Sequence, residues 1–400
     1  PQPKAKPEAI QAIERAAETQ RQAIQNRQDL TQDEKDAAKA KVTQAAATAT
    51  KAVEDAADQN AVTQAKTNGT TAIAGITPEA KVRPDAIKEV EAAAEAKKDQ
   101  ISKNKELTAE EQAKAIQAVT EAVQNARNAI NGSDTNALVG TAKEAGLAAI
   151  GAIQGEAKSK PAALAAVAQA AETKKQGIER NAALTSDEKA EAVRKVNEEL
   201  AKAQQAIKDA ANDEAVTNEQ GKGSIAISGV AETPVARPAA DRVVEAAAAA
   251  KRQEIESNGK LTEEEQKAAL AKVDAALAAA KEEIKQAESS ADVAAKGEAG
   301  KAAIEAIKAI EDQAQSTKDL AKAAITQAEQ DKKRQIENNT QLTREEKNDA
   351  ISAVEAKADA ARNAIDAAKK LADVQAQEVQ GKADIAGVAE TPAAKNAAKA

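Results

Sequence analysis

Apolar residues recur along this chain at helical spacing. Ile10, Ile13, Ala17 and Ile24 follow one another at intervals of 3, 4 and 7 residues, so they lie on one face of an α-helix. Two further stripes follow before the pattern starts again. Their members are Val42, Ala46, Ala49 and Val53, then Val62, Gly69, Ile73 and Ile76. The pattern predicts a unit of three amphipathic helices that repeats along the chain.

A two-residue motif, Leu-Thr, marks the period of this repeat. It begins at Leu30, Leu107, Leu184, Leu261 and Leu342, and each copy is followed by two residues and a glutamate. The steps are 107−30 = 77, 184−107 = 77, 261−184 = 77 and 342−261 = 81. A fixed period of this length is typical of a repeat protein, in which each unit contacts mainly its neighbours. We therefore expect the function to reside in the array.

Each Leu-Thr motif predicts the start of the second helix of a unit. The threonine is placed to cap the helix, the glutamate three residues later completes a capping box, and the leucine acts as a hydrophobic staple. The predicted capping residues are Thr31 and Glu34, Thr108 and Glu111, Thr185 and Glu188, Thr262 and Glu265, and Thr343 and Glu346. The alternative is a metal site built from adjacent acids such as Asp187 and Glu188. We disfavour it because neighbouring side chains on a helix point in different directions.

One glycine recurs at the same register of the third apolar stripe. The five copies are Gly69, Gly146, Gly223, Gly300 and Gly381. Glycine inside a helix costs about 0.8–1 kcal/mol relative to alanine, so its recurrence predicts a place where two helices approach closely. A hinge or simple drift is the alternative, but drift would not hold one register.

Prolines divide the units. The first helix is predicted to open at Pro7, Pro84, Pro161 and Pro238, because proline is tolerated in a first helical turn, and Asp319 stands at this place in the fifth unit. These positions define a leader, residues 1–6, and five repeats, residues 7–83, 84–160, 161–237, 238–318 and 319–400. Residues 308–318 contain no proline or glycine, so this last joint is predicted to be either a continuous helix or a helix recapped at Ser316 or Thr317.

The predicted fold is all-α, a tandem array of three-helix bundles that forms an elongated, monomeric rod. A helix of about 26 residues is about 39 Å long, so five units end to end would reach roughly 200 Å. Cores of Ala, Val and Ile bury little area per residue. We therefore expect modest stability in each unit and unfolding of one unit at a time under load.

Composition excludes most catalytic and binding chemistry. The chain has no His, Cys, Met, Trp, Tyr or Phe, which removes the usual imidazole base, thiolate nucleophile, soft metal ligand and base-stacking ring. The net charge of −8 arises from interleaved acidic and basic residues, without the basic stripe that nucleic-acid binding needs. No apolar run is long enough to span a membrane. We expect no enzyme, no cofactor and no metal site.

Four segments resemble a known family. They are the first-helix segment AAAEAKKDQI (92–101), the second-helix start LTAEEQAKA (107–115), the third-helix segment TNGTTAI (67–73) and the joint PEAKVRP (78–84). Together they resemble helical repeats of unknown function that occur in tandem in large cell-wall-anchored surface proteins of staphylococci and other Gram-positive bacteria. Biofilm-associated and methicillin-resistance-associated surface proteins carry such repeats. The resemblance covers the chain from Pro7 onward.

The resemblance implies a spacer that projects an adhesive head from the bacterial cell wall, with neighbouring repeats as its partners. The chain begins at Pro1 without a signal peptide and shows no wall-sorting signal, so we interpret it as a piece of a longer extracellular protein. Absence of sulfur suits an exposed location, although an Ala-rich repeat can drift to this composition in any compartment. Two alternatives remain: an array that itself binds a host matrix or cell-wall polymer, and a desiccation-type helical protein.

Overall fold

The computed structural model describes residues 4–400, and every regular element in that range is an α-helix. The prediction of an all-α repeat array is thereby confirmed. The helices divide into two compact units. The first holds the chain up to Glu172 together with Asn197–Gly229, and the second holds Thr173–Val196 together with Val230–Ala400.

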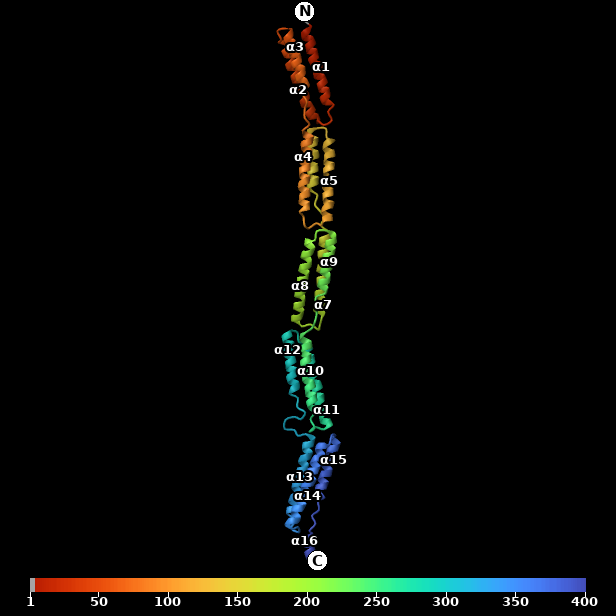
Figure 1. The fold of residues 1–400 in the computed structure, drawn as a ribbon, viewed down its shortest axis with the longest axis vertical. Helices are drawn as coiled ribbons and strands as arrows, with labels where there is room; N and C mark the ends of the chain where they lie inside the picture. Colours follow the sequence, from red (N-terminus) through yellow and green to blue (C-terminus); the bar gives the residue numbers. More distant parts are fainter. Residues whose placement is uncertain (1–3) are drawn as a thin grey trace. The chain divides into compact units, whose positions relative to one another are not determined.

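In the first unit, α1, α2 and α3 lie side by side, and α4, α5 and α6 do the same (Figure 1). Each helix of a trio packs against the other two. The unit also holds α9 and parts of α7 and α8. The helices are α1 (Ala5–Gln25), α2 (Gln32–Glu54), α3 (Gln59–Ala74), α4 (Val82–Ser102), α5 (Ala109–Asn131), α6 (Asn136–Gly151), α7 (Ser159–Arg180), α8 (Ser186–Asp209) and α9 (Asp213–Ser228).

The second unit holds the remaining parts of α7 and α8 and two complete trios, in which each helix again packs against the other two. A short helix, α16, follows them. The helices are α10 (Ala236–Glu256), α11 (Glu263–Gln286), α12 (Ser290–Glu305), α13 (Thr317–Glu337), α14 (Arg344–Ala367), α15 (Leu371–Ala386) and α16 (Ala393–Lys399). We number the repeats 1 to 5 by their first helices, α1, α4, α7, α10 and α13.

The core of each repeat is narrow because small side chains fill it. In repeat 1, Ile13, Val42 and Ile73 are fully buried, and alanines occupy most of the other core positions. The predicted stripe is shifted at one place: Ala9 is buried, whereas Ile10 packs against the core only in part. Ile76 also lies beyond the end of α3, and its N–H donates to the Ile73 carbonyl (3.1 Å). It still covers one end of the core.

In repeats 1 to 4, the first helix begins earlier than its proline indicates. Residues 5 and 6, predicted to be a leader, belong to α1. Pro7 is the third residue of α1, and Pro84 is the third residue of α4. Proline is tolerated there because the first N–H groups of a helix have no acceptor within it. The prolines therefore lie inside the first turn and do not mark its start.

The connection between repeats 4 and 5 is a loop that ends in a new cap. α12 ends at Glu305, and α13 begins after Ser316, whose hydroxyl accepts from the Asp319 N–H (3.1 Å). The predicted alternative of a continuous helix is wrong, and recapping at Ser316 is observed. The residues between α12 and α13 number 316−305 = 11, against 235−228 = 7 between α9 and α10. The loop thus takes up the four extra residues of the 81-residue step.

Candidate functional site

The first turn of each second helix contains the capping box. Thr31 is fully buried and precedes α2. Its hydroxyl accepts from the Glu34 N–H (3.2 Å), and the Thr31 N–H donates to the Glu34 carboxylate (2.8 Å). The same two bonds occur at Thr108 with Glu111, Thr185 with Glu188, Thr262 with Glu265, and Thr343 with Glu346. The leucine before each threonine is buried in the core.

The capping-box glutamate also contacts the next repeat. The second carboxylate oxygen of Glu34 accepts from the N–H groups of Lys81 (3.0 Å) and Val82 (2.9 Å), where α4 begins. Lys81, the N-cap of α4, provides no side-chain cap of its own. The next three repeats use Glu111 with Lys158 and Ser159, Glu188 with Val235 and Ala236, and Glu265 with Thr317. One glutamate therefore caps two helices that belong to different repeats.

The acid before this glutamate caps a third helix. Asp33 Oδ2 accepts from the N–H of Asn136 (2.7 Å), the first residue of α6. In return, the Gln32 N–H at the start of α2 donates to the Asp134 carbonyl (2.8 Å). Equivalent acid contacts are Glu110 with Asp213, Asp187 with Ser290, and Glu264 with Leu371. From here on, we use "joint" for the whole set of contacts between two successive repeats.

Three helix N-termini thus meet at each joint, and two carboxylates serve all three. Each N-terminus carries a partial positive charge from its unpaired N–H groups, so their meeting would be unfavourable without an anion. Burial raises the pKa of Glu188, but the N–H groups of Thr185, Val235 and Ala236 outweigh it, and the pKa lies below its ordinary value. The same balance lowers the pKa of Glu34 and Glu111. Glu34, Glu111 and Glu188 are therefore held in the charged form that the joint requires.

A buried cation completes the joint. Arg83, the second residue of α4, is only 8% exposed and donates to the carbonyls of Gln28 (2.8 Å) in repeat 1 and Ser133 (2.6 Å) in repeat 2. Lys160, Arg237 and Lys318 occupy this place at the later joints. They bind the carbonyls of Lys105 and Lys208, Ala182 and Ala287, and Gly259 and Asp366, respectively. Each cation bridges two repeats through backbone oxygens.

The recurrent glycines lie inside the repeats, away from the joints. A Cβ added at Gly69 would lie 2.4 Å from the Ala49 Cβ, and one added at Gly146 would lie 2.6 Å from the Ala126 Cβ. Added Cβ atoms at Gly223, Gly300 and Gly381 would be within 2.6 Å of an alanine Cβ as well. No flexible side-chain end is available to move, because the obstructing atom is attached directly to the helix backbone. At these positions α3 and its equivalents approach the second helix of the same repeat.

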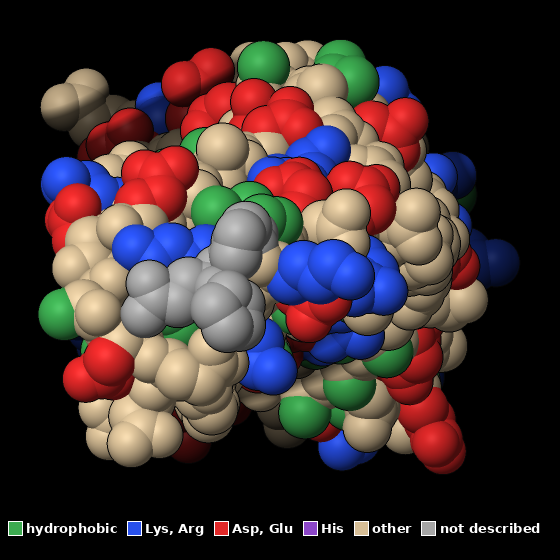
Figure 2. Space-filling model, turned by 90° about the horizontal axis from the view of Figure 1, so that it is seen from above, with side chains coloured by type: hydrophobic (Ala, Val, Ile, Leu, Met, Phe, Trp, Pro, Cys, Tyr) green, Lys and Arg blue, Asp and Glu red, His purple; other side chains and the backbone are tan. Residues whose placement is uncertain are grey.

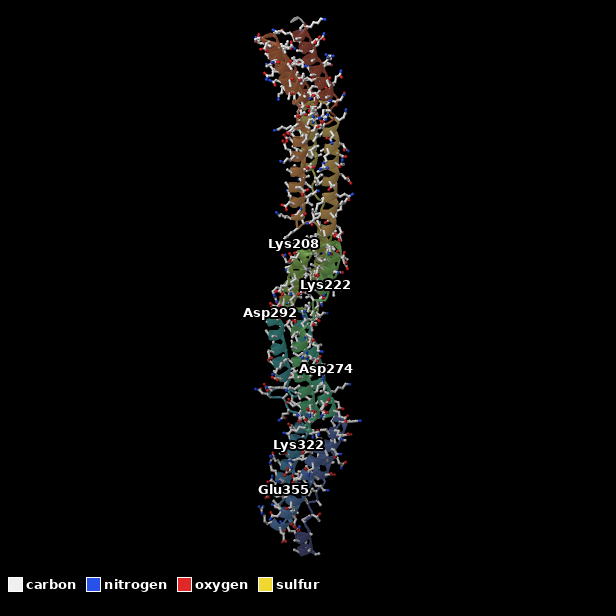
Figure 3. The ribbon with its side chains drawn as sticks, turned by 45° about the horizontal axis from the view of Figure 1, so that its top comes forward. Lys208, Lys222, Asp274, Asp292, Lys322 and Glu355 are labelled. Atoms are coloured by element: carbon white, nitrogen blue, oxygen red, sulfur yellow. The ribbon has the colours of Figure 1, made fainter. Side chains whose placement is uncertain are left out.

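Charged side chains cover the outer faces of the helices. Lys222 and Asp274 are two of the charged side chains labelled in Figure 3. Lys222 pairs with Glu219 in α9, and Asp274 of α11 pairs with Arg252 of α10. Figure 2 shows lysine and arginine side chains interspersed with acidic ones on the face that it presents. Exposed pairs of this kind contribute about 0–1 kcal/mol each. They favour solubility more than they fix the fold.

Residues 4–400 contain neither a metal-binding cluster of acids nor a membrane-spanning helix. No group of three or more acidic side chains in this range is arranged to hold a metal ion. No helix in the same range is both long and apolar enough to cross a membrane.

Sequence reasoning placed the capping residues but missed their partners across the joint. It assigned the acids to the local cap alone and did not single out Arg83 and its equivalents. A charge-by-register comparison could have found both sets. Acids recur at Asp33, Glu110, Asp187, Glu264 and Glu345, and cations recur at Lys6, Arg83, Lys160, Arg237 and Lys318.

The trios of helices and the repeated joints define a tandem helical repeat protein. The family model described as "Domain of Unknown Function (DUF1542)" matches five consecutive segments, residues 5–81, 82–158, 159–235, 236–312 and 317–393. The chain therefore belongs to the DUF1542 family. All five matches begin at the first residue of a first helix, and the first three end one residue before the next first helix begins.

Similar proteins come from Staphylococcus aureus. Over 286 residues the chain is 26% identical to "Extracellular matrix-binding protein EbhA" of strain Newman, a match that covers 72% of this chain and 8% of that protein. It is equally similar to "Extracellular matrix-binding protein ebh" of strains NCTC 8325 / PS 47 and COL, where it covers 3% of each. The match thus spans less than a tenth of the length of these relatives. No solved structure matches the chain.

Proposed function

We propose that these repeats are a structural spacer in a bacterial cell-surface adhesin and project an adhesive head from the cell wall. The observation that carries the proposal is the joint. At each of the four joints, carboxylates of one repeat accept from backbone N–H groups of the next. A module built only to bind a ligand would not need its neighbours held by the same set of contacts each time.

The chemistry of the joint suits a load-bearing role. Most of its partners are backbone N–H and carbonyl groups, which every residue except proline supplies in full. The joint therefore tolerates sequence change in the loops that face it. Related proteins are named as extracellular matrix-binding proteins, which supports a location outside the cell for the protein that contains these repeats.

The second candidate is an array that itself binds a host matrix or cell-wall polymer. The names of the relatives favour it, although the chain corresponds to only a small part of each of them. The desiccation-type alternative predicts little helix in dilute buffer. A circular dichroism spectrum dominated by helix would argue against it.

Small-angle scattering on the full chain tests the spacer proposal. Five repeats held end to end predict a maximum dimension of roughly 200 Å, and a compact particle would contradict it. Saturable binding of the same chain to immobilised matrix proteins or purified cell wall would instead favour the binding array. Substitution of Glu188 by alanine should shorten or broaden the distance distribution without affecting such binding.

A further inference from the structure

The chain contains three Asn-Gly pairs, Asn68–Gly69, Asn131–Gly132 and Asn258–Gly259. The side-chain amide of asparagine can be attacked by the backbone nitrogen of the next residue, and glycine offers no side chain to hinder the approach. The attacking nitrogen must be free to move. Gly69 lies inside α3, and the Gly132 N–H donates to the Asn128 carbonyl (3.0 Å). These two pairs are therefore held by helical hydrogen bonds.

Asn258–Gly259 lies instead in the loop between α10 and α11. The Asn258 Oδ1 accepts from the Lys260 N–H (3.1 Å), which holds the side-chain carbonyl over the Gly259 peptide and polarises its carbon. Gly259 is exposed, and a Cβ added there would meet nothing within 4 Å. The pair thus combines a positioned amide carbon with an unhindered nitrogen.

Other repeats contain the same turn without the glycine. Asn104, Asn181 and Asn339 accept from the N–H groups of Glu106 (3.0 Å), Ala183 (3.1 Å) and Gln341 (3.0 Å). The residues that follow these asparagines are Lys105, Ala182 and Thr340. These three asparagines are therefore internal controls within the same chain.

We propose that Asn258 is a site of spontaneous modification that loosens the joint between repeats 4 and 5. The Gly259 nitrogen attacks the Asn258 Cγ, the Cγ–Nδ2 bond breaks, and ammonia leaves. The nitrogen gives up its proton and a succinimide ring remains. Water then opens this ring at either carbonyl, which yields aspartate or isoaspartate. No oxidant or cofactor takes part.

The position of Gly259 links this chemistry to the joint. Its carbonyl accepts from Lys318 Nζ (3.0 Å), and the same ammonium binds the Asp366 carbonyl (2.8 Å). Lys318 is only 3% exposed, so it cannot readily find a replacement partner in water. Isoaspartate adds one methylene to the backbone just before this carbonyl and displaces it from the buried ammonium.

Incubation of the full chain at mildly alkaline pH, followed by digestion and mass spectrometry, tests the reaction. We expect Asn258 to lose its amide first, with isoaspartate detected by isoaspartyl methyltransferase labelling. The variant Gly259→Ala reproduces the Asn181–Ala182 pair and should slow the loss to the rate at Asn181. The proposal is overturned if Asn258 reacts no faster than Asn104 and Asn181, or if Gly259→Ala leaves its rate unchanged.

Hydrogen exchange on aged and fresh protein tests the consequence. The amides of Thr317 and Leu371, at the joint between repeats 4 and 5, should exchange faster in aged protein, whereas those of Ala236 and Ser290 should not. Aged Gly259→Ala protein is the matched control and should resemble fresh protein. Unchanged exchange at Thr317 and Leu371 in fully modified protein would contradict the effect on the joint.

Discussion

The joint between repeats 3 and 4 and the joint between repeats 4 and 5 differ in their linkers but share their contacts. The first has a seven-residue linker that contains Pro234, and the second has an eleven-residue linker in which Gln313 adopts a positive φ of 66°. Both nevertheless place a capping-box glutamate, Glu188 or Glu265, on the start of the following helix. The contacts of the second helix therefore define the joint, and the linker length is free to vary.

The two joints differ in which groups cap the first helix of the following repeat. In repeat 4, Pro238 is the third residue of α10 and has no N–H, so Glu188 caps the helix start with two bonds, to Val235 (2.7 Å) and Ala236 (3.2 Å). In repeat 5, Asp319 stands in place of the proline, and its N–H donates to Ser316. α13 thus has a local cap in addition to the shared one. We expect α10 to depend on its neighbour more than α13 does.

The largest change in the free energy of unfolding is expected from a substitution inside a repeat. Such a substitution tests the stability of the repeat itself, independently of the joints. Gly146→Leu should destabilise repeat 2 by about 1–3 kcal/mol, because its side chain must displace α5. Gly146→Ala should also destabilise, since its Cβ would lie 2.6 Å from the Ala126 Cβ. The control in the same helix is Gly140→Ala. A Cβ added at Gly140 would have no neighbouring atom within 4 Å, so this substitution should stabilise the protein by up to about 1 kcal/mol. Urea unfolding curves measure both, and equal stability of the Gly146 variants and the parent would refute the close approach.

Removal of the shared caps should expose the difference between the two joints. Glu188→Ala should cost about 1–2 kcal/mol, the usual range for a lost cap. Glu265→Ala should cost less, because Ser316 still caps α13. Glu191→Ala, on an exposed position of α8, is the control and should change little. Thermal unfolding of the three variants makes the comparison, and an equal loss at Glu188 and Glu265 would mean that the local cap adds nothing.

Acid should weaken the joints in a defined direction. The pKa of Glu188 is lower in the folded chain than its ordinary value of 4.5, so this glutamate contributes stability that is fully present above about pH 4.5. That contribution is lost as the pH falls through the lowered value. Glu188→Gln removes this titration and should flatten the dependence of stability on pH in the acid range. A parallel pH profile for the variant and the parent would show that Glu188 is not coupled to folding.

The smallest effect is expected from the linker. Insertion of four Gly/Ser residues between Ala231 and Glu232 gives the joint between repeats 3 and 4 the linker length of the next joint. Because doubling a loop costs only about 0.6 kcal/mol, the unfolding midpoint should move little. A large loss of stability would mean that the short linker, and not the shared carboxylates, aligns the repeats.

Local signals in the sequence were enough to predict the helices, because each second helix begins with a capping box in its own sequence. Thr31 and Glu34 lie three residues apart, and the box they form needs no distant partner. The start of the first helix was misplaced for the opposite reason. Lys81 has no capping side chain, and its cap, Glu34, lies 47 residues earlier. Period and propensity carry no information about a cap supplied by another repeat.

The joint itself was missed because its acids already had a local explanation. Asp33 in a first helical turn is favourable with any helix dipole, so nothing in its own segment points to Asn136, which is 103 residues away. The buried cation gave an opposite local signal, since a positive charge in the first turn of α4 is unfavourable to that helix. Arg83 is explained only by the carbonyls of Gln28 and Ser133.

Amide hydrogen exchange at the joint between repeats 3 and 4 tests the central claim most directly. Asp187 binds the Ser290 N–H (2.7 Å) and Glu188 binds the Ala236 N–H (3.2 Å). Asp187→Ala should therefore speed exchange at Ser290 but not at Ala236, and Glu188→Ala should do the reverse, although both amides belong to the next repeat. Unchanged protection at both amides, or an equal loss throughout repeat 3 in both variants, would contradict the account that these carboxylates join one repeat to the next.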